Sequence, residues 1–232
     1  GQVVASGTLD ASGRGVGQHG GQVIVTGEHV ALGAHSQVDV AGTRGGGEIA
    51  LGSTGLQGAA PHSTDGQFAD KSVTVEVAAG SRLVADALVN GDGGAVTLWS
   101  TDTTRFGGSI SARGGAEGGN GGFAEVSSSK NIGLTGDVDL RAPHGRTGLL
   151  MLDPTDLRIV DSSASSGSQD GNAGDGSVAA GDANQGSGST LNTISSGLLE
   201  SLAGNANILL QATGQITVGS MAGSDGRIDL QT

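Results

Sequence analysis

Hydrophobic and polar residues alternate along most of the chain in short segments that follow glycine-rich corners. One set of segments reads GGQVIVTG, GGEIALGS, GGAVTLWS, GGFAEVSS and TGLLMLDP, and its members begin at residues 20, 46, 93, 121 and 147. A second set reads GTLDASG, SQVDVAG, GSISARG and GDVDLRA, and its members begin at residues 7, 36, 108 and 136. Alternation with a period of two residues is typical of β-strands that bury one face. The pattern therefore predicts an all-β chain with an internal repeat of roughly 26 to 28 residues.

The same alternation predicts which side chains face the interior. In the first set they are Val23 and Val25, Ile49 and Leu51, Val96 and Leu98, Ala124 and Val126, and Leu150 and Leu152. In the second set they are Leu9 and Ala11, Val38 and Val40, Ile110 and Ala112, and Val138 and Leu140. A unit of two or three short strands cannot bury its apolar face alone, whereas coils stacked about 4.8 Å apart cover one another and pair their backbone groups. The expected fold is therefore a parallel β-helix.

Two stretches interrupt the repeat. Residues 54–91 contain SVTVEVAAG and SRLVADALVNGDGG, which suit either a decorating insertion or one irregular coil. Residues 161–189 are rich in Gly, Ser and Asp and poor in apolar side chains, so we expect a flexible loop there. The β-helix coils are then expected over residues 1–53, 92–160 and 205–232.

Residues 190–204 follow a different period, which predicts a short helix packed on the coils. The segment begins with Ser and Thr residues that can cap a helix, and Gly204 follows as a stop signal. Its apolar residues recur at helical spacing, at Leu191, Ile194, Leu198, Leu199 and Leu202.

Gly15, Gly17 and Gly20 also match the G-x-G-x-x-G pattern of a dinucleotide-binding turn. That turn needs a helix after it, because the helix N-terminus meets the pyrophosphate. Here Gly20 leads directly into the strand-like segment QVIVT. We therefore interpret these glycines as a corner that the chain turns repeatedly.

Composition excludes several classes of partner. The formal net charge is −12, so the chain lacks the basic surface with which proteins neutralise nucleic-acid phosphates, and we expect no nucleic-acid partner. No apolar run is long enough to span a bilayer, so we expect no membrane insertion. The chain contains no Cys, which excludes disulfides and thiolate metal sites.

The segments GGFAEVSS, LLMLDPTDLRIVD and GQITVGS resemble the large exoproteins of two-partner secretion systems. These are the filamentous haemagglutinin-like adhesins and biofilm-matrix adhesins of Gram-negative bacteria. The resemblance implies a right-handed β-helical shaft, exported through an outer-membrane two-partner transporter and placed outside the cell, secreted or on its surface. Both ends of the chain read as strand in mid-pattern, so we expect a segment of a longer protein.

The function that follows is a non-enzymatic shaft and interaction segment of an adhesin. Its partner would be an exopolysaccharide, or a glycan or protein receptor on a host. Family membership alone does not choose among functions, so a haem- or host-protein-capturing exoprotein remains an alternative.

Trp99 is the first candidate for a binding residue. Because Val96 and Leu98 are predicted to point inward, Thr97 and Trp99 should point outward, and Met151 should lie on the same face. An outward Trp can stack on a sugar ring or anchor a partner protein. The alternative is that the 54–91 stretch covers this face.

Asp10, Asp39 and Asp139 share one outward position in the second set of segments, with Ser111 at the same position. A ladder of unpaired carboxylates repels itself, so a cation would relieve it, and Ca²⁺ is the expected ion. Stacked acids on a β-helix also suit a calcium-dependent polysaccharide lyase. The simpler interpretation is solvated Asp at strand ends, and no catalytic residue is assigned. We expect no cofactor, and Ca²⁺ held by these aspartates is the alternative.

Overall fold

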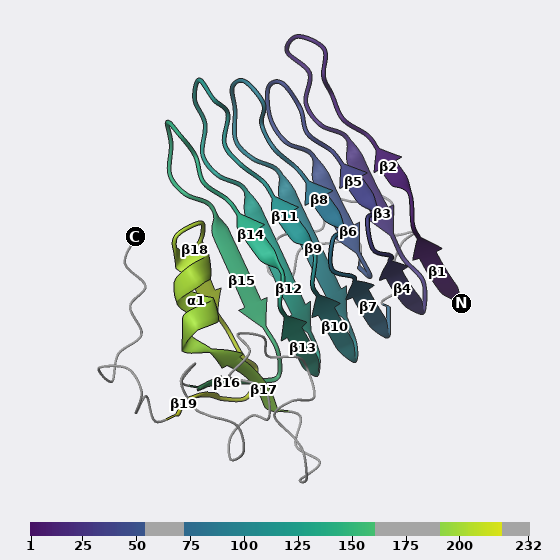
Figure 1. Ribbon diagram of the computed structural model, residues 1–232, viewed down its shortest axis with the longest axis vertical. Helices are drawn as coiled ribbons and strands as arrows, with labels where there is room; N and C mark the ends of the chain where they lie inside the picture. Colours follow the sequence, from purple (N-terminus) through teal and green to yellow (C-terminus); the bar gives the residue numbers. More distant parts are fainter. Residues whose placement is uncertain (54–71, 161–190, 220–232) are drawn as a thin grey trace.

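The computed structural model describes residues 1–53, 72–160 and 191–219, which form short parallel strands and one helix (Figure 1). The first sheet contains, in order, β1 (Gln2–Ala5), β4 (His29–Leu32), β7 (Thr74–Val77), β10 (Thr103–Phe106) and β13 (Asn131–Leu134). The second sheet contains β2 (Thr8–Asp10), β5 (Gln37–Asp39), β8 (Arg82–Val84), β11 (Ser109–Ser111) and β14 (Asp137–Asp139). The third sheet contains β3 (Gln22–Val25), β6 (Glu48–Leu51), β9 (Ala95–Ser100), β12 (Phe123–Ser128), β15 (Leu149–Asp153) and β18 (Asn207–Leu210). The predicted all-β class is confirmed.

Almost every strand of these sheets pairs with the strand three places along the chain, and each pair is parallel. Three consecutive strands therefore contribute one strand to each sheet, and we call such a set a coil. Because the pairs are in register, equivalent side chains form columns through the stack. In the third sheet one interior column runs Val23, Ile49, Val96, Ala124, Leu150 and Ile208.

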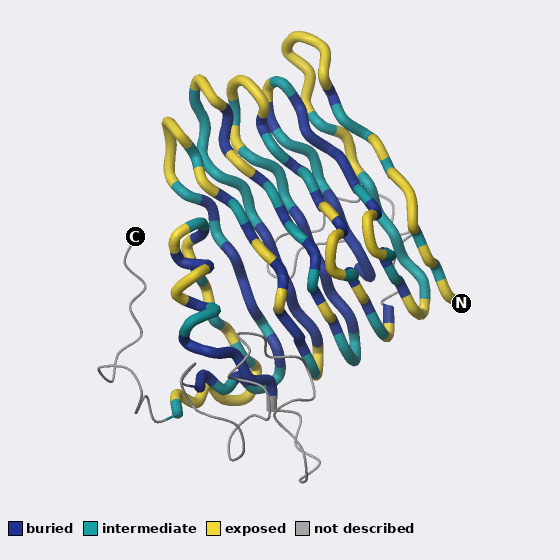
Figure 2. Tube along the Cα trace, in the orientation of Figure 1, coloured by how far each residue is buried: buried dark blue, intermediate teal, exposed yellow. Residues whose placement is uncertain are grey.

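Buried residues follow the strands of the stack (Figure 2), and within the described residues their apolar side chains form one interior cluster. All the side chains predicted to point inward either belong to this cluster or pack against it; the partly buried ones are Leu9, Ala11, Val23 and Val25 in the first coil. Phe106 and Leu134 of the first sheet complete it, each 1% exposed. Thr104 is buried in the same sheet, and its hydroxyl donates to the Ser127 carbonyl at 2.8 Å.

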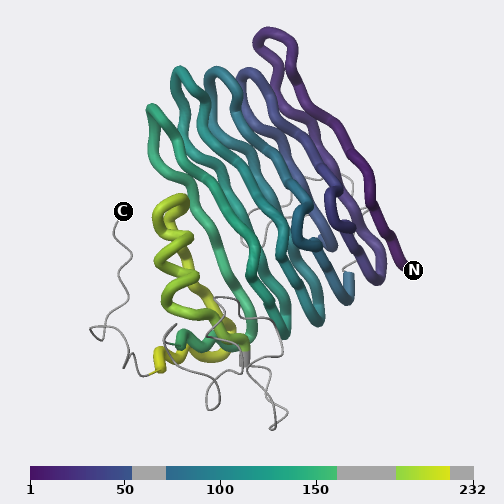
Figure 3. The backbone as a smooth tube through the Cα atoms, in the orientation of Figure 1, coloured from purple at the N-terminus to yellow at the C-terminus, as the bar shows by residue number. Residues whose placement is uncertain are grey.

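The connections from the second sheet to the third lie side by side beyond the strand ends, and we call residues 11–21, 40–47, 85–94, 112–122 and 140–148 the loop stack (Figure 3). Backbone hydrogen bonds link neighbouring loops, for example Gly46 N to Asp92 O at 3.0 Å and Gly93 N to Asn120 O at 2.9 Å. Each loop is also closed at its base by a backbone hydrogen bond, for example from Gly122 N to Ala112 O at 2.8 Å. The loop stack is therefore a built part of the fold.

Gly-Gly pairs stand where the loop stack joins the third sheet. A Cβ on Gly20 would lie 1.7 Å from Val40 O, and a Cβ on Gly121 would lie 1.7 Å from Leu140 O. Only glycine allows the backbone to approach so closely. The interpretation of Gly20 as a corner is confirmed, since β3 begins directly after Gly21.

The 54–91 stretch is more regular than either sequence interpretation allowed. Its strands β7 and β8 pair in register with β4 and β5 on one side and with β10 and β11 on the other. Residues 54–71 lie outside the described residues. On either side of them the chain leaves and returns at one place, because Ser72 N donates to Gly52 O at 2.9 Å.

The helix predicted over 190–204 is shorter than expected. Leu191–Ser195 forms strand β17, and α1 covers only Ser196–Ala203, with Ser195 as N-cap and Gly204 as C-cap. β17 pairs with β16 (Asp156–Val160), which also pairs with β19 (Ile216–Val218) in a fourth sheet. The β-branched Thr193 and Ile194 suit this strand, and pairing with β16 outweighs the helical spacing. The predicted 161–189 loop and the coil residues 220–232 lie outside the described residues.

These C-terminal elements cover one end of the stack. Leu199 and Leu202 of α1 are buried against the interior, and Asn205 O accepts from Leu140 N at 2.9 Å beside β14. The side chain of Asn192, in β17, forms hydrogen bonds with the edge of the first sheet at β13 and just before it. Its Oδ1 accepts from Ile132 N at 2.6 Å and its Nδ2 donates to Lys130 O at 2.7 Å.

Candidate functional site

Trp99, Thr97 and Met151 lie on the outer face of the third sheet, as predicted, but they are buried. Their exposed fractions are 7%, 1% and 6%, and none belongs to the interior cluster. Thr97 and Met151 both align with Glu125, which is 0% exposed. The structure therefore brings these residues together, but it does not present Trp99 as an open platform for a sugar ring.

Asp153 lies beside this buried group, in register with Ser127. Burial raises the pKa of the Asp153 carboxyl above its ordinary value of 3.8. The Asp153 Oδ1 and Ser127 Oγ atoms are buried and form no hydrogen bond within the described structure.

The three predicted aspartates do not form one ladder. The column through the second sheet reads Asp10, Asp39, Val84, Ser111 and Asp139. The prediction missed Val84 because β8 was placed in an interruption of the repeat. Asp10 and Asp39 are therefore neighbours, whereas Asp139 lies three strands beyond Asp39.

Each of these carboxylates caps its own turn, and Asp39 and Asp139 also form ion pairs with arginines of the chain. Asp10, Asp39 and Asp139 accept from the backbone N–H two residues later at 2.8, 2.9 and 3.1 Å. Asp39 is 4% exposed and also accepts from Arg14 Nη2 at 2.6 Å, so it is not the solvated residue that was expected.

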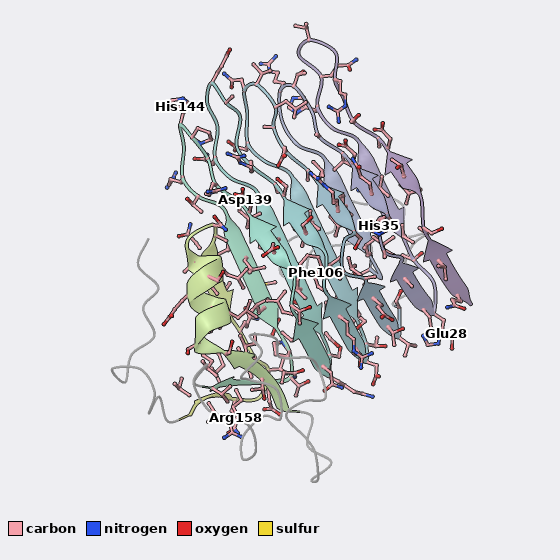
Figure 4. The ribbon with its side chains drawn as sticks, viewed as in Figure 1. Glu28, His35, Phe106, Asp139, His144 and Arg158 are labelled. Atoms are coloured by element: carbon pink, nitrogen blue, oxygen red, sulfur yellow. The ribbon has the colours of Figure 1, made fainter. Side chains whose placement is uncertain are left out.

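Asp139 sits at the base of the loop stack, below His144 (Figure 4). Arg141 donates to it through Nε at 2.9 Å and Nη2 at 2.7 Å, and Arg113 Nε lies 3.7 Å away. Burial acts to raise the pKa of Asp139, but the hydrogen bonds and charges of Arg141, with the charge of Arg113, outweigh it and lower the pKa. Over the described residues, no group of three or more His, Asp or Glu side chains is placed to hold a metal ion.

The structure instead opens a trough where the loop stack joins the third sheet. It is a shallow surface feature that is open to solvent and not an enclosed cavity. The floor is peptide backbone, formed by the glycine pairs of four successive coils at 20–21, 46–47, 93–94 and 121–122. The side chains that line it are Gln22, Glu48, Asp92, Ala95 and Phe123.

Hydrogen bonds within the trough and from the adjoining loop stack fix its polar side chains. Gln22 Nε2 donates to Glu48 Oε2 at 2.7 Å, and Asp92 Oδ1 accepts from Asn120 N at 2.6 Å. Asn120 Oδ1 in turn accepts from Arg146 N at 3.0 Å. Carboxylate oxygens that accept hydroxyl hydrogens, together with the ring of Phe123, suit a polyhydroxylated ligand lying across the coils.

No protein-family model matches this chain. A search of curated proteins gives no match to it either.

The trough was missed from the sequence because its glycines were interpreted only as corners. The available signal was the residue after each Gly-Gly pair, which reads Gln22, Glu48, Ala95 and Phe123 in successive coils. Within the described residues no helix has the length and apolar character needed to cross a membrane.

Proposed function

We propose that this chain is a right-handed parallel β-helix that serves as a shaft and interaction segment of a secreted bacterial adhesin. In that role it mediates attachment, aggregation or binding to a polysaccharide matrix or a host receptor. The observation that carries the proposal is the strand order, in which three parallel sheets each take every third strand. Connections between parallel strands of one sheet are almost always right-handed, which gives the hand of the helix.

A stack of this kind is suited to forming a long, extended shaft. Each added coil lengthens it by about 4.8 Å and contacts only its neighbours, so length does not need a larger core. Hydrogen bonds between coils continue through the loop stack, as from Gly121 N to Arg146 O at 2.8 Å. The resemblance to two-partner exoproteins adds export through an outer-membrane transporter and a place outside the cell.

We assign the trough as the surface of this chain that binds the receptor. It crosses four coils, so an extended chain of sugars can contact several of them at once. Its ionisable lining residues, Glu48 and Asp92, are acidic, and the whole chain has a net charge of −12. These charges favour a neutral polysaccharide and disfavour uronate or sulfated chains.

The test is binding of the 232-residue chain to immobilised neutral glycans, with alginate and heparin as acidic comparisons. Phe123→Ala and Glu48→Gln should each weaken binding at least several-fold, since they remove the ring and one carboxylate acceptor. Glu117→Gln is the matched control, because Glu117 is exposed in the loop stack and does not line the trough. If the folded chain binds no neutral glycan, or prefers alginate, the receptor role is contradicted.

A further inference from the structure

A small pocket lies near the start of the loops whose ends form the trough. Three successive loops of the loop stack build it where they leave the second sheet, and it is smaller and more enclosed than the trough. Backbone hydrogen bonds join the three loops here, from Ala87 N to Arg113 O at 2.9 Å and from Gly114 N to Arg141 O at 3.0 Å. The walls of the pocket are therefore held in place by the fold itself.

One carboxylate and one guanidinium line the pocket. Asp86 Oδ1 accepts from Ser111 Oγ at 2.6 Å and from Arg113 N at 2.7 Å, which fixes the carboxylate, while Oδ2 accepts from no described residue. Arg113 Nε lies 3.7 Å from Asp139, which takes its side-chain hydrogen bonds from Arg141 instead. The two Nη atoms of Arg113 therefore donate to nothing in the described part of the chain, and its side chain is 44% exposed.

Apolar side chains form the rest of the wall. They are Ala87, Leu88, Ala116 and Pro143. Leu88 is 37% exposed, and Ala116 and Pro143 are also exposed. The pocket thus combines one negatively charged acceptor, one positively charged donor and a small apolar surface.

This combination selects a neutral group that both donates and accepts hydrogen bonds. A carboxylate on the ligand would be repelled by Asp86, and a cation would be repelled by Arg113. A secondary amide donates through its N–H and accepts through its C=O, and both bonds would be made to charged partners. An acetamido group adds a methyl that the apolar wall can cover.

From this complementarity we infer that the pocket binds the acetamido group of an N-acetylhexosamine in a polysaccharide. Its N–H donates to Asp86 Oδ2, its C=O accepts from Arg113 Nη, and its methyl packs against Leu88 and Ala116. The choice of a sugar over an acetylated peptide rests on the proposed function, in which the receptor is a neutral polysaccharide, and N-acetylated hexosamines carry no charge. The pocket shares no residue with the trough, so it is a second site.

Calorimetric titration of the 232-residue chain with two trisaccharides tests the inference. Triacetylchitotriose carries one acetamido group on each ring, whereas cellotriose has the same linkage with a hydroxyl in its place. We expect cellotriose to bind roughly tenfold more weakly or worse, because it leaves the paired hydrogen bonds unmade. Equal affinities for the two trisaccharides would overturn the inference.

Two variants locate the site. Ala116→Leu fills the pocket from an exposed position, and Arg113→Gln removes the guanidinium; each should weaken triacetylchitotriose binding roughly tenfold or more. Glu117→Leu and Arg82→Gln are the matched controls, because both residues are exposed and neither lines the pocket, and they should leave the affinity unchanged. An unchanged affinity in either pocket variant contradicts this site. Far-ultraviolet circular dichroism checks that every variant keeps its sheets.

The trough variants separate this site from the proposed function. Phe123→Ala and Glu48→Gln should leave triacetylchitotriose binding unchanged; if they weaken it, the acetamido group lies in the trough and the inference is wrong. Long neutral glucans without acetamido groups report on the trough alone, so their failure to bind contradicts the proposed function and not this pocket. Nε-acetyllysine presents the same group on a peptide side chain, and tighter binding of it than of triacetylchitotriose would overturn the assignment to a sugar.

Discussion

At the residue scale, burial disfavours the charged form of the Asp153 carboxyl group. Burial raises the pKa of Asp153 in the folded chain above its ordinary value of 3.8, so the folded state binds its proton more tightly than the unfolded state does. Its contribution to stability is therefore most favourable below that ordinary value and is lost as pH rises through the folded pKa.

Asp153→Asn should remove this pH-dependent cost while keeping the shape of the side chain. We expect the variant to be more stable than the unsubstituted chain at pH 7 and to lose that advantage near pH 3. Urea unfolding at the two pH values measures it. A variant that is equally destabilised at both would mean that the carboxylate makes a favourable contact instead.

At the element scale, Asn192 joins the first sheet to the fourth. It is 2% exposed, and its amide bonds to Ile132 N, Lys130 O and Asp156 O. Asn192→Ala leaves these buried backbone groups without their partner, and we expect a loss of about 2 kcal/mol or more in unfolding free energy. Asn207→Ala is the control, because Asn207 is exposed and makes a single bond to Thr147 O. Equal losses in chemical denaturation would show that Asn192 does not hold the junction.

Some features of the strands and helix could be predicted from the sequence, and others could not. Alternation correctly placed residues such as Val96 and Leu98, because the period of a strand fixes which face each side chain takes. It could not reveal that Trp99 is covered, since burial of an outer face depends on contacts far along the chain. Val84 was missed because the long interval between the segments that begin at residues 46 and 93 hid a regular coil. The strand Leu191–Ser195 was missed because pairing with β16 overrides the local helical spacing.

At the scale of the whole molecule, the stack continues past residues 54–71 without a break. Gly52 O accepts from Ser72 N, and Ser72 O accepts from Thr101 N in the next coil at 2.8 Å. Deleting residues 54–71 and joining the flanks with a short Gly-Ser linker should therefore preserve the parallel sheets. We expect an unchanged far-ultraviolet spectrum and one cooperative melting transition. A spectrum of unfolded chain would mean that the stack depends on those residues.

The step of three between paired strands has a consequence for how the protein is made. Neighbouring strands in the sequence never pair with each other in the first three sheets, and the first pairing of the stack joins Gln2 to His29. A chain emerging from a ribosome thus closes no sheet until a full coil has followed, and pairing between residues so far apart in sequence slows folding. Each finished coil then offers its strand edges to the neighbouring coil, so the sheets grow one coil at a time from wherever the first pairing forms.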